Sequence, residues 1–115
     1  MKKPELARAE HINRQIPPQP HTAMYVWHKY WSRKTWNVVG DHIKAYTLDH
    51  EVVFDPFAGN GVVAVEAVRN KRRAIVCDLL PIANRITELT LRRVSTTKLL
   101  EAFLTCASAR AKADQ

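Results

Sequence analysis

The sequence predicts an α/β fold built on a parallel β-sheet, and three features carry this prediction. An apolar run over residues 52–54 predicts a strand over 51–54 that leads directly into a loop with two glycines. Helical spacing follows over 61–70, and a second apolar run over 73–77 ends at Asp78. A strand, a glycine loop, a helix and a second strand in this order are typical of a parallel sheet that forms a nucleotide-shaped site. Because such sheets normally have more than two strands, we expect half of a larger doubly wound domain.

The part of the chain before the first strand divides near residue 22. Residues 1–22 are polar and rich in proline, so we expect an N-terminal extension with a short helix over 4–11 and then an extended tether. Residues 23–115 form the predicted domain, and apolar spacing over 37–46 predicts its first helix. Before that helix, five aromatic residues lie within twelve positions, mixed with basic residues: Tyr25, Trp27, Tyr30, Trp31 and Trp36.

Helices account for the rest of the predicted domain. Pro81 suits the first turn of a helix that reaches about residue 93. Ser95 is a plausible cap for a last helix that ends near Ala111. Since half a sheet leaves apolar surface to cover, we expect this last helix to pack on the domain or to dock a partner.

Composition and charge narrow the class of protein. The net charge of +7, from 18 Lys and Arg against 11 Asp and Glu, favours an anionic partner, with nucleic acid first and an inert basic surface as the alternative. No apolar run suits a membrane span or a signal peptide, so we expect a cytoplasmic protein without a membrane partner. Cys77 and Cys106 lack metal-type spacing, and we expect both as buried free thiols. The five histidines show no ligand spacing either, so no metal site is expected.

The glycine loop is the predicted ligand site. Gly59 and Gly61 would let the backbone approach a ligand closely, and the helix that begins after them would present free N–H groups. Asp78, after the second strand, is placed to accept hydrogen bonds from two ribose hydroxyls. Asp55, after the first strand, could pair with an ammonium group. The alternative is a tight turn made by the two glycines, with Asp78 as a helix cap.

Two cofactors fit this pattern. Residues 59–64 match the G-x-G-x-x-A dinucleotide fingerprint, which would again use Asp78 for a ribose. Asp55, however, would repel a pyrophosphate and attract the methionine ammonium of S-adenosylmethionine. The acidic neighbour therefore favours S-adenosylmethionine over a dinucleotide.

Residues 55–61, Asp-Pro-Phe-Ala-Gly-Asn-Gly, resemble motif I of the DNA amino-methyltransferases, which methylate exocyclic amines of adenine or cytosine. Residues 72–81 are similar to the motif that follows in that family, and residues 28–39 resemble the segment that precedes motif I. The resemblance spans about residues 23–93. It departs from the family pattern at four positions, which hold Thr35, Asn60, Val62 and Leu80 in place of Pro, Ser, Thr and Asn.

The resemblance implies a partial Rossmann-like methyltransferase fold, S-adenosylmethionine as cofactor and DNA as partner, in site-specific methylation of the restriction-modification kind. In the family the segment before motif I packs against the methionine part of the cofactor, so His28 and Lys34 could approach the cofactor carboxylate, with ordinary surface residues as an equal alternative. The expected cofactor contacts from the two motifs are Asp55, Pro56, Phe57, Ala58, Gly59, Gly61, Asp78 and Leu79.

The family's catalytic motif, Asp/Asn/Ser-Pro-Pro-aromatic, has no match in the chain. Residues 16–19 have the double proline but neither the polar residue nor the aromatic. We therefore expect no catalytic residue and no DNA methylation by this chain alone. The chain would be the N-terminal piece of a longer or split enzyme, completed by a second polypeptide, or a non-catalytic binding module or remnant.

Two further groups have competing interpretations. The aromatic residues over 25–36 could stack bases and bind phosphates, but we favour walls of the core or of the cofactor pocket. The basic residues over 69–73 are expected to be a solvated helix end, with contact to a DNA backbone as the alternative.

Overall fold

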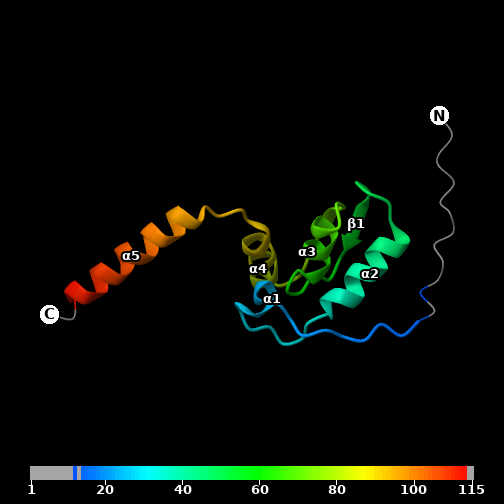
Figure 1. Cartoon of the computed structure of the whole chain (residues 1–115), viewed down its shortest axis with the longest axis horizontal. Helices are drawn as coiled ribbons and strands as arrows, with labels where there is room; N and C mark the ends of the chain where they lie inside the picture. Colours follow the sequence, from blue (N-terminus) through cyan, green and yellow to red (C-terminus); the bar gives the residue numbers. More distant parts are fainter. Residues whose placement is uncertain (1–11, 13, 114–115) are drawn as a thin grey trace.

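A computed structural model describes residues 12 and 14–113 of the chain. Strands β1 (Val52–Asp55) and β2 (Arg73–Val76) pair in parallel, with Val52 opposite Arg73 and Asp55 opposite Val76. Helix α3 (Val62–Arg69) connects the strands and packs on both of them (Figure 1). The predicted strand, helix and strand are confirmed, with ends that differ by one residue.

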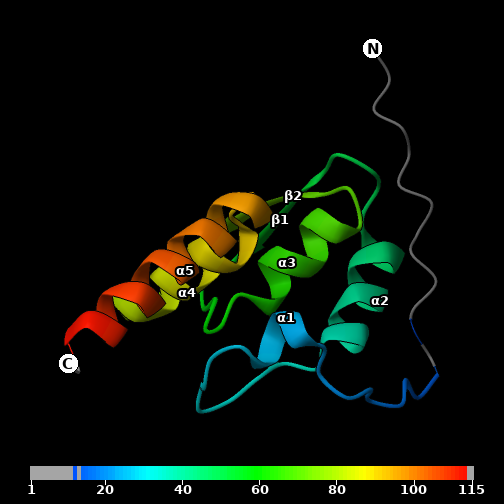
Figure 2. The ribbon, with the colours of Figure 1, turned by 60° about the vertical axis from the view of Figure 1, so that its left-hand side comes forward.

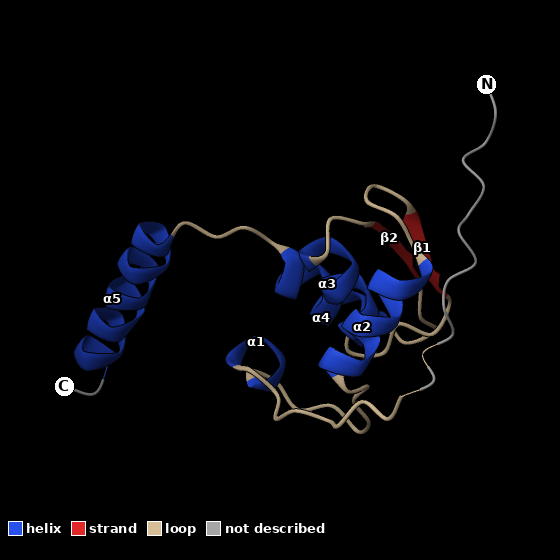
Figure 3. Ribbon diagram, turned by 45° about the vertical axis from the view of Figure 1, so that its right-hand side comes forward, coloured by secondary structure: helices blue, strands red, loops and turns tan. Residues whose placement is uncertain are grey.

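Four more helices complete the described part of the chain (Figure 3). Helix α2 (Trp36–Tyr46) lies along α3, and α4 (Pro81–Leu91) contacts α3 as well. Helix α5 (Thr96–Ala113) begins just after Ser95, whose hydroxyl accepts a long hydrogen bond of 3.5 Å from the Lys98 amide. Helix α1 (Ala23–Val26) is a single turn that the apolar spacing did not predict. The helix predicted over residues 4–11 lies outside the described residues.

The core is small and lies between α1, α2 and α3. Its fully buried side chains are Tyr25, Val62 and Val65, against which Trp36 and Val39 pack. Tyr25 donates a hydrogen bond to the buried carboxylate of Glu66, which also pairs with Arg69 at 3.0 Å. This burial, together with the Glu66 carboxylate, raises the pKa of Tyr25. The core therefore fixes the segment before α2 against the helix that follows the glycine loop.

One face of the sheet is not covered. Val52, Phe54 and Ile75 alternate along the two strands and are 43%, 62% and 58% exposed. Alternate residues of a strand point to opposite faces, so these three side chains share the face away from α3. The described residues thus form a small α/β fold with flanking helices rather than a complete doubly wound sheet.

Helix α5 does not pack on the domain as one alternative expected. It extends away from the other elements (Figures 1 and 3), although the view of Figure 2 projects it onto α4, and all of its side chains are exposed. Only Leu99 in its first turn lines a shared apolar cavity, with Met24 and Leu89 among the other lining residues. The four-residue connection after α4 carries the helix away from the core, so the apolar side chains beyond its first turn stay exposed.

Three other expectations are wrong. Cys77 and Cys106 are exposed rather than buried, because Cys77 follows the end of β2 and Cys106 lies on α5. Within the basic cluster, Arg72 is not solvated: its side chain is 9% exposed and donates hydrogen bonds to both oxygens of Thr47. Trp27 and Trp31 are 51% and 84% exposed, so the expectation that they form walls of the core is wrong, whereas a place beside the cofactor stays a prediction. No helix in the described part of the chain has the length and apolar character to span a membrane.

Candidate functional site

The site forms where the two parallel strands end. The Cys77 amide donates a hydrogen bond of 3.1 Å to the Asp55 carbonyl, and the Ala58 amide donates one of 3.0 Å to the Cys77 carbonyl. These two hydrogen bonds hold the segment that follows β1 against the segment that follows β2. This is the edge of an open α/β sheet at which ligands generally bind.

Both glycines of the loop have left-handed backbones that side chains rarely adopt. Gly59 has φ 54° and Gly61 has φ 79°. A Cβ at Gly59 would lie 3.4 Å from the Tyr30 ring, and a Cβ at Gly61 would lie 2.9 Å from Thr87 Cγ2. Gly61 is also the N-cap of α3, whose first N–H groups have no partner within the helix. The loop is thus a tight turn, closed by a hydrogen bond of 2.9 Å from the Gly61 amide to the Ala58 carbonyl, and it leads into the first turn of α3.

Asp78 joins the two halves of the site. Its Oδ2 accepts a hydrogen bond of 2.8 Å from the Gly59 amide, and its Oδ1 accepts one of 2.9 Å from the Leu80 amide. These two bonds, that from Leu80 first, lower the pKa of the Asp78 carboxyl. Each carboxylate oxygen keeps a lone pair for a further donor. The N-cap position of α4 is Leu80, so Asp78 organises the loop rather than capping that helix.

Asp55 and Lys34 form an ion pair beside the loop. Lys34 Nζ lies 3.0 Å from Asp55 Oδ2 and donates a second hydrogen bond of 3.1 Å to the Phe57 carbonyl. Asp55 Oδ1 accepts a hydrogen bond of 3.0 Å from the Phe57 amide. A lysine ammonium therefore already contacts the carboxylate that we expected to pair with an ammonium of the ligand. The fold thus brings Lys34 and Asp55 together as an ion pair with each other, whereas each was expected to contact the ligand.

Apolar side chains flank the loop at both strand ends. Phe57 is 78% exposed and Leu79 is 95% exposed, one after each strand. Pro56 is exposed as well, whereas Ala58 is 2% exposed and packs beneath the turn. The loop thus presents two uncovered apolar side chains, next to the carboxylate of Asp78, to anything that binds there.

His28 is not brought to the loop. Its ring packs edge-on against Trp27 at 4.5 Å, and neither ring nitrogen has a hydrogen-bond partner. Burial, and then the nearby Arg33, lower its pKa. Within the described part of the chain, the ring contact of His28 is with Trp27, and its ring nitrogens make no hydrogen bond to the residues of the loop.

Three residues near the loop were not predicted from the sequence as site residues. Tyr30 and Thr87 contact the two glycines, and Asn60 is 3% exposed with its Nδ2 unpartnered. Asn60 stood out as a departure from the family motif, and Tyr30 lay in the aromatic segment. Thr87 gave no local signal, because its contact with Gly61 crosses 26 positions of sequence.

A polar cavity of about 360 Å³ lies away from the loop, between α2 and α3. Its two acids are already paired, Asp41 with Lys44 at 2.6 Å and Glu66 with Arg69 at 3.0 Å. No group of three or more metal-ligating side chains is found in the described part of the chain. The strand-end loop is therefore the better candidate for a ligand site.

The architecture is that of a small α/β protein whose glycine loop and Asp78 lie at the carboxyl ends of its two parallel strands. The chain belongs to the DNA methylase family, whose model matches residues 7–88. The matched region includes both strands, the glycine loop and most of α4, and it ends before α5. No curated protein and no solved structure matches the chain.

Proposed function

We propose that the glycine loop binds S-adenosylmethionine, and that the chain is the cofactor-binding part of a DNA methyltransferase acting on exocyclic amines of adenine or cytosine. The observation that carries the proposal is the contact of Asp78 with the Gly59 amide across the ends of the two strands. It places an ionised carboxylate directly beside a loop that has no side chain at Gly59 or Gly61. A ribose with two adjacent hydroxyls fits such a pairing.

The residues present fit this cofactor. Asp78 would accept the ribose hydroxyls, and the exposed Phe57 and Leu79 would flank a flat purine. The Nδ2 of Asn60 is buried beneath the loop and has no hydrogen-bond partner among the described residues. When bound, the cofactor supplies a methyl group activated on a sulfonium. The chain's own residues hold and orient it.

Charge favours this cofactor over a dinucleotide. Asp55 and Asp78 stand at the two strand ends, and Lys34 is the cation paired with Asp55. Two carboxylates and one ammonium leave the loop with an excess of negative charge. That excess would repel a pyrophosphate and attract the cationic sulfonium and ammonium of S-adenosylmethionine.

The chain is proposed to bind cofactor without transferring methyl groups alone. The Pro-Pro-aromatic motif that holds the target amine in this family is absent from all 115 residues. We propose that a second polypeptide segment supplies it to the completed domain. The bare sheet face formed by Val52, Phe54 and Ile75 supports this proposal, because parallel sheets are normally covered on both faces.

Calorimetric titration with S-adenosylmethionine and, separately, with NAD tests the proposal. We expect saturable binding of S-adenosylmethionine only. Asp78→Asn should weaken it on the order of tenfold or more, because a hydrogen bond to a charged group contributes about 1.5–3 kcal/mol. Glu101→Gln removes the same charge on the exposed α5 and should change nothing.

Two outcomes would contradict the proposal. Tighter binding of NAD would make the loop a dinucleotide site. Failure of a chain shown by circular dichroism to be folded to bind either ligand would favour a non-catalytic remnant.

A further inference from the structure

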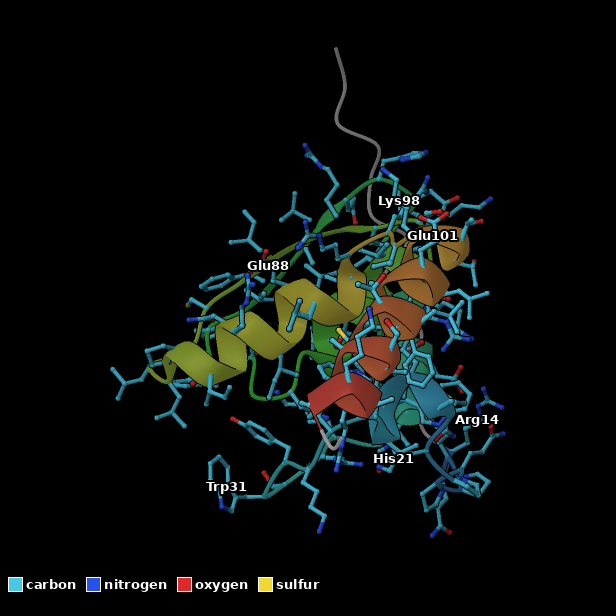
Figure 4. The ribbon with its side chains drawn as sticks, turned by 90° about the vertical axis from the view of Figure 1, so that its left-hand side faces the viewer. Arg14, His21, Trp31, Glu88, Lys98 and Glu101 are labelled. Atoms are coloured by element: carbon cyan, nitrogen blue, oxygen red, sulfur yellow. The ribbon has the colours of Figure 1, made fainter. Side chains whose placement is uncertain are left out.

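Trp31 is the most exposed of the aromatic side chains in the described part of the chain, at 84%. It lies in the loop between α1 and α2, at the outer edge of the molecule (Figure 4). An uncovered indole leaves a large apolar area in water, and such area commonly marks a site for a partner. The function proposed above does not use this side chain.

Trp31 is part of a small built surface rather than an isolated side chain. Its ring meets that of Tyr30 edge-on, with centroids 5.3 Å apart and an interplanar angle of 69°. Lys29, Tyr30 and Trp31 line an open, mainly apolar cavity of about 370 Å³. We call these three residues the Trp31 platform.

Tyr30 lies between Trp31 and the glycine loop and contacts both. Its ring would lie 3.4 Å from a Cβ at Gly59, so it stands directly against that loop. Trp31 contacts the ring of Tyr30 and is one residue further from the loop. A ligand on Trp31 would therefore be a neighbour of the cofactor rather than the cofactor itself.

The charge around the platform favours an anionic partner. No acidic residue stands between Glu10 and Asp41, whereas Lys29, Arg33 and Lys34 lie beside Trp31. Lys34 pairs with Asp55, and Arg33 bonds the His28 carbonyl, so Lys29 is the nearest cation not used in those contacts. Exposed aromatic rings next to cations are the pattern of surfaces that bind unpaired nucleic-acid strands.

We propose that Trp31 stacks on an unpaired base of the DNA strand presented to the glycine loop, while Lys29 contacts the adjacent phosphate. The inference rests on the proposed function, which supplies DNA as the partner. Stacking of a base on an aromatic ring is worth on the order of tenfold in affinity or more. The surface would hold the strand next to the cofactor without reading its sequence.

Fluorescence anisotropy with a labelled single-stranded oligonucleotide, at about 50 mM salt, tests the proposal on the full chain. Trp31→Leu keeps apolar bulk but removes the aromatic face, and Trp31→Phe restores such a face. We expect Trp31→Leu to weaken binding about tenfold and Trp31→Phe to recover most of it. Trp27→Leu is the matched control, because Trp27 is half-exposed but bonds Thr90 instead.

A second strand with abasic positions separates stacking from charge. The unsubstituted chain should bind it about tenfold more weakly than the base-containing strand, and Trp31→Leu should not weaken it further. Equal affinities of the Trp31→Leu and unsubstituted chains for the base-containing strand would overturn the proposal. So would a loss of S-adenosylmethionine binding in Trp31→Leu with DNA binding intact, because Trp31 would then be a cofactor wall. DNA binding is measured without cofactor, so the result of this test does not depend on whether the glycine loop binds S-adenosylmethionine.

Discussion

Gly61→Ala should be far more damaging than Gly59→Ala, although both glycines have left-handed backbones. At φ 54° and φ 79° respectively, an alanine would cost about 1–2 kcal/mol at either position. At Gly59 little is added, because the nearest atom to a new Cβ is Tyr30 Cε1 at 3.4 Å. Gly59→Ala should therefore lower the free energy of unfolding by about 1–2 kcal/mol.

At Gly61 a steric cost is added to the conformational one. The new Cβ would lie 2.9 Å from Thr87 Cγ2 and 3.0 Å from Thr87 Cβ, and it would also meet Thr87 Oγ1. Thr87 is 4% exposed and short, so it cannot swing aside. Overpacking of this kind costs about 1–3 kcal/mol. The total for Gly61→Ala is then about 2–5 kcal/mol, a large part of the stability of a small domain.

Urea unfolding of a double-mutant cycle isolates the contact. Thr87→Ala removes Oγ1 and Cγ2 but leaves Cβ 3.0 Å from the new Cβ, so Gly61→Ala in that background should cost less than in the unsubstituted chain, falling toward the conformational cost of about 1–2 kcal/mol. Should Gly61→Ala prevent folding outright, the double substitution should restore a cooperative transition. Equal costs for the two glycines, or no relief from Thr87→Ala, would refute the packing of α4 against the loop.

Three other predictions concern the described fold. Tyr25→Phe should cost about 1 kcal/mol at neutral pH by removing the hydrogen bond to Glu66. The pKa of Tyr25 is raised in the folded state, so the stability that its neutral hydroxyl contributes is fully present below the unfolded pKa near 10 and is lost as pH rises further. The melting temperature should therefore fall less steeply between pH 8 and 11 in Tyr25→Phe than in the unsubstituted chain. Arg72→Lys should cost about 2 kcal/mol, because an ammonium cannot reproduce the several bonds of the buried guanidinium, whereas the exposed Arg73→Lys should stay within about 0.5 kcal/mol in urea unfolding. The pKa of Asp78 is lowered by the Leu80 and Gly59 amides, so the stability that its carboxylate contributes is present above the unfolded pKa near 3.8 and is lost as pH falls below it. Acid unfolding of Asp78→Asn should lack this pH dependence. An acid unfolding profile that is unchanged in the variant would contradict the hydrogen bonds of Asp78 with the two amides.

The strand, loop and helix around the site could be predicted because their signals are local. The apolar runs, the two glycines and Asp78 each specify their own backbone, and their order specifies the parallel pairing. The ion pair of Lys34 with Asp55 was not predicted, because it joins residues 21 positions apart. Both were identified separately as site residues, but only the fold shows that they neutralise each other.

Other parts of the structure depend on contacts that leave no local pattern. Arg72 lies in a run of basic residues, which normally indicates a solvated surface. It is buried because the Thr47–Asp49 turn folds over its guanidinium. Cys77 follows an apolar strand, but one face of the sheet is bare, so the apolar run did not guarantee burial.

Mapping of S-adenosylmethionine onto the backbone amides by NMR tests the central claim most directly. The titration would follow each amide of the ¹⁵N-labelled chain. We expect the largest chemical-shift changes at the amides of Gly59, Gly61 and Asp78, and we expect these changes to disappear in Asp78→Asn. Changes centred instead on Gly40 and Asn70, which line the cavity between α2 and α3, would contradict the assignment of the cofactor site to the glycine loop.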